Sequence, residues 1–312
     1  MPIYSRTELD RVAGKYGFVR DSFEKVLRIM KILEFLNTQE YLKEHFILKG
    51  GTAINLTIFN MPRLSVDIDM DFEPNCSSEE MADAREKAAS ILQLYMESEG
   101  YVLGSDSRKS HSLDAFHYRY QNAAGNTDML KIEINYSLRC HLFTARFRPI
   151  LAEAFGQALD VNVLDPIEIF ASKANARVSR AAARDLYDFY NMISNDMFAD
   201  RRDMFRKSII FYNTISADSV NKEFDTSALD TITMTKIRRD LIPMLSDRGK
   251  FSLEMRMKRT KEYIADLMKT SDAEKEYMER FEKKEYRPEL LFDDEDILDR
   301  ISNHPMAMWK CR

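Results

Sequence analysis

Carboxylates occupy every second position of one short segment, residues 63–72 (RLSVDIDMDF), at Asp67, Asp69 and Asp71. The residues between them are apolar, and in a β-strand successive side chains point to opposite faces. We therefore predict a strand with one apolar face toward a core and three carboxylates on the other face. Neighbouring like charges repel, so they ionise readily when a cation lies between them. Mg²⁺ prefers hard oxygen ligands, which makes Asp67 and Asp69 candidate ligands for Mg²⁺, or alternatively Mn²⁺.

The same spacing occurs in two other kinds of segment. Taken alone, the pattern is equally typical of the solvated edge of an antiparallel strand. A calcium-binding loop is excluded, because Phe72 occupies the position of its required glycine and Ser78 that of its final glutamate.

A second alternating segment, residues 130–136 (LKIEINY), carries Glu133 in the middle of its polar face, beside Lys131 and Asn135. Placed next to the first strand, Glu133 would supply a third carboxylate to a metal. In isolation, the segment is more typical of an ordinary strand with an exposed glutamate.

Gly50, Gly51 and Thr52 stand between a β-prone run and the start of a helix. Such a turn lets backbone N–H groups approach an anion, and a helix N-terminus favours phosphate. A glycine pair alone is weak evidence, because tight packing explains many of them. The sequence contains neither GxxxxGK nor GxGxxG, which excludes a P-loop and gives no support to a dinucleotide-binding fold.

A fourth pattern lies in residues 173–190 (KANARVSRAAARDLYDFY). At about 100° per residue, five charged side chains lie within about 80° of one another if the helix is unbroken. They are Lys173, Arg177, Arg180, Arg184 and Asp188. The four cations would suit a triphosphate or an RNA backbone. Taken alone, the stripe favours a surface helix in which Arg184 and Asp188 pair.

The elements that must position these residues follow from hydrophobic periodicity. We expect helices over 22–36, 53–59, 78–99 and 167–194, strands over 46–49, 65–72, 116–120 and 130–138, and a solvated helical stretch over 256–284. We also expect Trp309 to lie in a core. Strands are thus interleaved with helices over residues 1–160 and are followed by helices over 161–312, so the simplest division is an α/β domain followed by a helical domain.

Composition limits the class of protein. The 312 residues include 46 basic and 51 acidic side chains, a net charge of −5, which excludes a basic coat over the whole molecule for nucleic acid. Cys76, Cys140 and Cys311 show no CxxC spacing, as expected in a reducing compartment. Neither a signal peptide nor an apolar membrane segment is recognisable. We expect a cytoplasmic protein without membrane association.

In their order along the chain, these segments resemble the DNA polymerase β-like nucleotidyltransferases. More specifically, the chain resembles the AbiEii/AbiGii nucleotidyltransferase toxin family in three segments, which are LKGGTAINL, PRLSVDIDMDF and KANARVSRAAARDLYDF. The ending, from YRPELLF to HPMAMWK, also resembles that family's C-terminal region. The resemblance covers nearly the whole chain and implies an α+β fold. We therefore expect a mixed sheet with flanking helices over residues 1–160, followed by a helical C-terminal domain over 161–312 that completes the active-site cleft.

The resemblance implies an enzyme that transfers a nucleoside monophosphate from an NTP to an acceptor with the help of Mg²⁺. In several members of the family that acceptor is the 3′ end of tRNA. The resemblance also implies a toxin of a prokaryotic toxin–antitoxin system, with a cognate antitoxin encoded nearby and a role in phage defence.

Residue by residue, Gly50, Gly51 and Ser65 match the family's phosphate-binding positions, and Asp67 and Asp69 match its metal-binding pair. Lys173 and Asp188 match its helical motif, together with Asp185. We assign catalytic roles to Asp67, Asp69, Lys173 and Asp188, and metal binding to Asp67, Asp69 and Glu133. Nucleotide binding is assigned to Gly50, Gly51, Thr52, Arg63, Ser65, Arg177 and Asp185, and RNA binding to Arg180 and Arg184.

Three alternatives stay open at the level of sequence. The same fold would serve transfer to a protein or to a small-molecule hydroxyl. A regulator that binds NTP or RNA without catalysis would bind NTP with Mg²⁺ and form no product. A pure interaction protein, with the acidic strand as a solvated edge, would show no stabilisation by NTP.

Overall fold

Alternating apolar and polar residues build the sheet that carries the aspartates. In the computed structural model, which describes residues 5–151, 158–180, 182–216, 220–246 and 251–312, the acidic segment forms strand β2 (Asp67–Phe72). Ile68, Met70 and Phe72 are buried on one face of β2. The predicted strand is therefore confirmed, although it begins two residues later than expected.

The described strands form one mixed sheet in the order β3-β5-β6-β2-β1-β8-β7, and β4 pairs with β5. Besides β2, they are β1 (Phe46–Lys49), β3 (Val102–Leu103), β4 (Arg108–Lys109), β5 (Leu113–Gln121), β6 (Thr127–Asn135), β7 (Arg146–Pro149) and β8 (Asp160–Val163). Strand β2 lies between β1, which is antiparallel to it, and β6, which is parallel. This mixed sheet and the helices around it confirm the α+β class.

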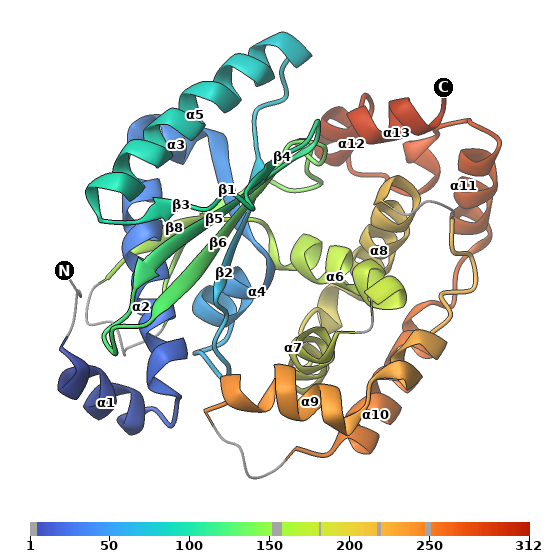
Figure 1. The fold of residues 1–312 in the computed structure, drawn as a ribbon. Helices are drawn as coiled ribbons and strands as arrows, with labels where there is room; N and C mark the ends of the chain where they lie inside the picture. The colour runs from blue at the N-terminus through green and yellow to red at the C-terminus, as the bar shows by residue number, and fades with distance from the viewer. Residues whose placement is uncertain (1–4, 152–157, 181, 217–219, 247–250) are drawn as a thin grey trace. The chain divides into compact units, whose positions relative to one another are not determined.

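Helices α2 (Arg20–Thr38), α3 (Glu40–His45) and α5 (Ser78–Ser98) lie along one side of the sheet (Figure 1). Helix α1 (Arg6–Lys15) precedes them. Helix α5 begins at Ser78, as predicted, and its N-cap Ser77 forms a capping box with Glu80. Apolar residues of β5 and β6, such as Phe116, Tyr118 and Ile132, are buried on this side.

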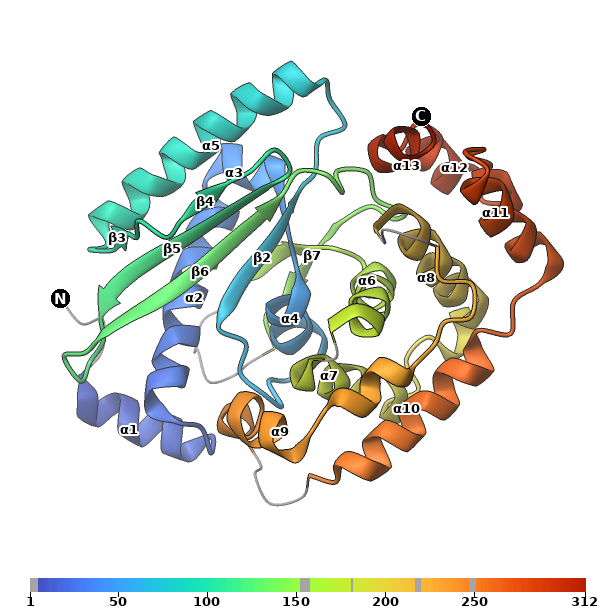
Figure 2. The same ribbon diagram turned by 45° about the vertical axis from the view of Figure 1, so that its right-hand side comes forward.

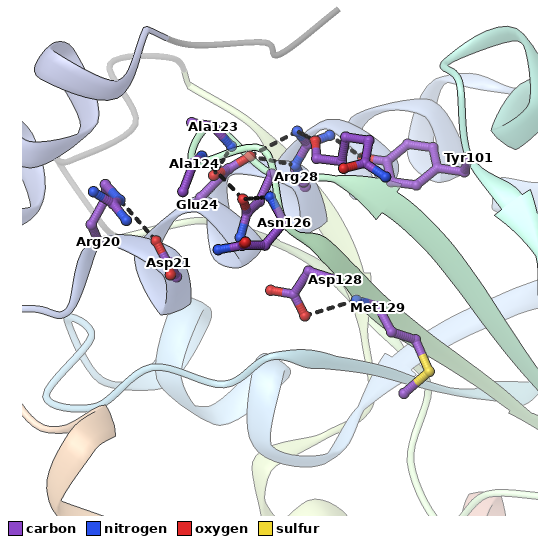
Figure 3. A network of polar contacts seen from close by, with 12 residues as sticks. Arg20, Asp21, Glu24, Arg28, Tyr101, Ala123, Ala124, Asn126, Asp128 and Met129 are labelled. Carbon is purple, nitrogen blue, oxygen red and sulfur yellow. Dashed lines mark hydrogen bonds and ion pairs between the residues drawn. The ribbon is translucent and has the colours of Figure 1, made fainter.

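A buried ion pair fixes α2 to the turn between β5 and β6 (Figure 3). Arg28 donates to Glu24 over 2.7 Å, and both side chains are almost completely buried. The second carboxylate oxygen of Glu24 accepts from the N–H of Ala123 over 2.9 Å. Because each buried charge has several partners, this network stabilises the hairpin against α2 rather than leaving an isolated charge.

The chain divides into two compact units, which are described here separately. Unit 1 holds residues 1–139, 145–164 and 243–247 and contains the sheet. Unit 2 holds residues 140–144, 165–242 and 248–312 and is helical. The domain boundary expected at residue 160 stays a prediction.

Unit 2 is built around α6 (Pro166–Arg180) and α8 (Arg202–Ser216) (Figure 2). The other helices are α7 (Ala183–Ser194), α9 (Met234–Asp240), α10 (Leu253–Leu267), α11 (Asp272–Glu282), α12 (Glu295–Ile301) and α13 (Pro305–Lys310). The buried carboxylate of Glu168 accepts from the backbone N–H groups of Leu142 and Phe143, over 2.8 and 3.1 Å. These bonds hold residues 140–144 against α6.

Three expectations about helices need correction. The stretch predicted as one helix over 167–194 is interrupted, because Ala182 is extended, with φ −83° and ψ 136°. The helix expected over 53–59 begins earlier, as α4 (Gly50–Ala53), and continues as a π-helical turn, Ile54–Ile58. Trp309 is 63% exposed on α13, so its assignment to a core was wrong. The solvated stretch over 256–284 falls in α10 and α11.

Candidate active site

The three aspartates of β2 differ in their surroundings. Asp67 and Asp69 are half-buried, whereas the Asp71 side chain is only 3% exposed and forms an ion pair with Lys49 of β1. Strand register also places Lys49 directly opposite Asp69. Asp71 is therefore neutralised within the protein by Lys49.

The glycine turn lies against the acidic strand. Gly50 has φ +72°, and a Cβ at this position would lie 3.0 Å from Asp69 Cβ and closer still to Asp69 Oδ2. A Cβ at Gly51 would lie 2.8 Å from Ser65 Oγ and 2.9 Å from Arg63 Nη2. Gly50 favours glycine because of its backbone conformation, and a Cβ at either position would overlap neighbouring side chains. The structure thus brings Gly50, Gly51, Ser65 and Asp69 together.

Thr52 and Arg63 are buried behind this turn. The Thr52 hydroxyl donates to the carbonyl of Asp67, and the Arg63 guanidinium, in a residue 1% exposed, donates to the carbonyl of Leu64 over 2.9 Å. Both side chains therefore hold the turn and the start of β2 in place. Their side chains do not face solvent, where a nucleotide would arrive.

Glu133 occupies the position expected from the sequence. In the parallel pairing of β2 and β6 it is the direct neighbour of Asp69. Its carboxylate forms an ion pair with Lys131 over 2.8 Å. Within the described ranges, no three His, Cys, Asp or Glu side chains converge closely enough to form a metal centre.

The donor set nonetheless fits a hard divalent cation. Asp67 and Asp69 are two residues apart on one strand face, so their carboxylates point the same way. The absence of a Cβ at Gly50 lets the Asp69 carboxylate lie directly against the backbone of the turn. Carboxylate oxygens at an open polar surface are the ligands that Mg²⁺ uses next to phosphates.

A second cluster lies in unit 2. Lys173 of α6 forms ion pairs with Asp185 and with Asp188 of α7, the latter over 3.1 Å. Asp188 is 0% exposed and Asp185 is 21% exposed. In an unbroken helix, Lys173 and Asp185 would be about 18 Å apart along the axis. The break at Ala182 is therefore what allows Lys173 to reach both carboxylates.

The break separates the four cations that were predicted to form one row on a single helix. Because α6 and α7 are separate helices, Arg184 does not continue the row that begins at Lys173. The pKa of Asp240 is lowered mainly by its hydrogen bond with Arg239 and further by the charge of Arg184. The side chains of Arg177 and Arg180 lie outside the described residues.

Lys49 is a candidate that the sequence motifs did not identify. It ends β1, directly before the glycine pair, and it holds Asp71 while facing Asp69. The signal available in the sequence was a lysine at the end of a β-prone run immediately before Gly50. The sequence does not identify Asp71 as the partner of Lys49, because Asp71 lies on a different strand.

A mixed sheet with a glycine turn against a paired-aspartate strand defines a nucleotidyltransferase fold. The family model described as "Nucleotidyl transferase AbiEii toxin, Type IV TA system" matches residues 33–291. The chain therefore belongs to the AbiEii nucleotidyltransferase toxin family of type IV toxin–antitoxin systems. Membership confirms the resemblance, and the family implies an NTP donor and an antitoxin.

Among solved structures, the chain is similar to MenT4, the nucleotidyltransferase toxin Rv2826c from Mycobacterium tuberculosis H37Rv. The TM-score is 0.64 at 17% sequence identity, and the match covers 95% of this chain and 98% of that chain. This likeness confirms the fold. A search of curated protein sequences finds no match. None of the helices in the described ranges has the length and apolar character of a membrane span.

Proposed function

We propose that the protein transfers a nucleoside monophosphate from an NTP to the 3′ end of tRNA, with Mg²⁺ held by Asp67 and Asp69. The observation that carries this proposal is the packing of Gly50 against Asp69. It sets a turn suited to phosphate beside carboxylates suited to a metal. The acceptor is proposed from the resemblance in sequence to family members that modify tRNA.

Each group near the turn would have a separate task. Backbone N–H groups at Gly50 and Gly51, and the Ser65 hydroxyl, would donate to phosphate oxygens. Thr52 and Arg63 would keep these groups in position through their bonds to the carbonyls of Asp67 and Leu64. When bound, Mg²⁺ would neutralise charge on the triphosphate and on the leaving pyrophosphate.

The unit 2 cluster contains the lysine that the family resemblance assigns to the triphosphate. Lys173 carries the charge, and Asp188, fully buried, fixes its ammonium group. Asp185 is the more accessible of the two partners, so Lys173 would release Asp185, rather than Asp188, when it binds a phosphate. A lysine suits this role because its ammonium is a compact point charge.

A transfer assay tests the proposal. The purified protein is incubated with Mg²⁺, total tRNA and one labelled NTP at a time, and label in tRNA is measured. Asp67→Asn should abolish transfer and leave the fold nearly unchanged, because it relieves a cluster of like charges.

Asp71→Asn is the matched control, since it makes the same chemical change on the same face of β2. Because Asp71 is already paired with Lys49, transfer should persist in this variant. Wild-type activity in Asp67→Asn, or equal loss in both variants, would contradict the assigned metal pair.

A further inference from the structure

We infer that the acceptor RNA approaches across strands β6, β5 and β4, on the polar face of the sheet, with Arg108 and Arg119 contacting its phosphates. This inference rests on the proposed function and adds the path of the acceptor to it. It follows from strand order, strand register and the distribution of charge within unit 1.

The direction of approach follows from the order of the strands. The glycine turn follows β1, which flanks β2 on one side, and β6 flanks β2 on the other. In phosphoryl transfer, the attacking and leaving oxygens lie roughly in line. With the pyrophosphate on the side of Gly50 and Gly51, the attacking hydroxyl must come from the side of β6.

Register extends the row that contains Asp69 to the edge of the sheet. Asp69 pairs with Glu133, Glu133 with Ala115, and Ala115 with Arg108 of β4. All these side chains share one face, because paired residues in a sheet point the same way. Three strand spacings place Arg108 about 14 Å from Asp69. Successive phosphates of one RNA strand are at least about 3.4 Å apart, so this distance spans at most about four of them.

The neighbouring rows add further cations to this face. Asp67 pairs with Lys131, and Lys131 pairs with His117. Arg119, whose side chain is 52% exposed, follows His117 on the same face of β5. The other face of β5 and β6 carries the buried residues packed toward α2 and α5, such as Tyr118 and Ile132. The open face is therefore the polar one.

Two carboxylates lie among these cations, and both are paired. Glu133 pairs with Lys131, and Asp106 pairs with His117 and Arg119 over 2.9 and 3.2 Å. Arg108 is exposed and, among the described residues, forms no ion pair. Arg108 is thus the cation most available to a phosphate, and Ala115, which is 9% exposed, lies between it and Glu133 in this row.

Adjacent residues of β4 supply a matched pair of variants. Arg108 and Lys109 are both exposed, but Arg108 pairs with Ala115 whereas Lys109 pairs with Asp114. Asp114 lies on the helix-covered side, where it binds Arg85 of α5. Arg108→Gln and Lys109→Gln therefore remove one charge each from opposite faces of the same edge.

The experiment measures transfer to total tRNA at several salt concentrations for wild type, Arg108→Gln, Lys109→Gln and Arg108→Gln/Arg119→Gln. The first variant should raise KM for tRNA at unchanged kcat, because Arg108 lies far from the reacting atoms. Each lost phosphate contact should reduce the slope of log affinity against log salt by about 0.7. The double variant lacks two phosphate contacts. When salt rises from about 50 to about 200 mM, the affinity of the wild type for tRNA should therefore fall about sevenfold more than the affinity of the double variant.

The outcomes separate the two proposals. If wild type transfers label to tRNA and Arg108→Gln behaves like Lys109→Gln, the path is wrong and the proposed function stands. If wild type binds NTP but labels only protein or a small molecule, the proposed RNA acceptor is overturned and the path with it. Equal effects of Arg108→Gln and Lys109→Gln on both KM and salt slope would indicate a general charge effect and would also overturn the path.

Discussion

Replacing Gly50 with alanine separates backbone strain from contact with Asp69. Gly50 has φ +72°, and Gly125, in the turn between β5 and β6, has φ +82°. A Cβ at Gly125 would meet nothing within 4 Å, whereas one at Gly50 would overlap the Asp69 carboxylate. Gly125→Ala therefore measures the strain alone, and Gly50→Ala measures strain plus overlap.

The expected magnitudes follow from these two terms. A left-handed backbone costs an L-residue about 1–2 kcal/mol, and the stiffer unfolded chain offsets about 0.4–1 kcal/mol of that. Gly125→Ala should therefore lower the free energy of unfolding by about 1 kcal/mol. Overlap in a packed site adds about 1–3 kcal/mol, so Gly50→Ala should lose about 2–4 kcal/mol in total.

Activity should fall by more than stability suggests. The overlap is relieved when the Asp69 carboxylate moves, and a shift of about 1 Å in a reacting group costs about 100-fold in rate. Urea unfolding followed by circular dichroism gives the stability, and label transferred to tRNA gives the activity. Gly125→Ala should keep nearly full transfer.

A double-mutant cycle identifies the contact. Asp69→Ala removes Oδ2 and Cγ, so it should recover part of the stability lost in Gly50→Ala, with a coupling energy of about 1 kcal/mol or more. The reasoning is refuted if Gly50→Ala matches Gly125→Ala in both stability and transfer, or if the cycle is additive.

Three further predictions concern charged and phenolic groups. Lys49→Met strands the buried Asp71 carboxylate and should cost about 2–3 kcal/mol in urea unfolding, most of which Asp71→Leu in the same chain should recover. Asp188→Asn should lower stability by about 1–3 kcal/mol, because Asp188 is 0% exposed, whereas Asp185→Asn should change it by less than about 0.5 kcal/mol; equal losses would contradict the assignment. Burial raises the pKa of Tyr118 from its ordinary 10.0 to about 12 and also raises the pKa of Tyr120 and Tyr136. The folded state thus holds these protons more tightly than the unfolded chain, so stability should be full below pH 10 and fall as the pH rises toward 12; tyrosinate absorbance equal to that of all 14 tyrosines near pH 10, before any unfolding, would contradict this.

Alternation along single strands predicted much of the acidic face, because a period of two is a local property of the chain. It placed Asp67, Asp69 and Glu133 on polar faces, and pairing then made Asp69 and Glu133 neighbours. The burial of Asp71 was not predictable in this way. It depends on Lys49, which comes from another strand and is recognisable as a partner only after β1 and β2 pair.

The interrupted helix shows a conflict between local preference and tertiary contacts. Ala181, Ala182 and Ala183 are strong helix formers, so the sequence predicted no break there. The chain nevertheless turns at Ala182, and Lys173 then pairs with two carboxylates that a straight helix would hold far away. Contacts of a buried charge exceed the propensity of one alanine, which is at most about 1 kcal/mol.

Composition does not show which cations lie on the same face of the sheet, and the proposed acceptor path depends on this. A net charge of −5 excludes a basic coat, but it says nothing of which cations share a face. Arg108 and Lys109 are adjacent in sequence and alike in charge, and only pairing with Ala115 assigns Arg108 to the face of Asp69. Strand register, rather than residue content, therefore determines whether a cation can contribute to transfer. For this reason the contrast between Arg108→Gln and Lys109→Gln tests the geometry and not merely the charge.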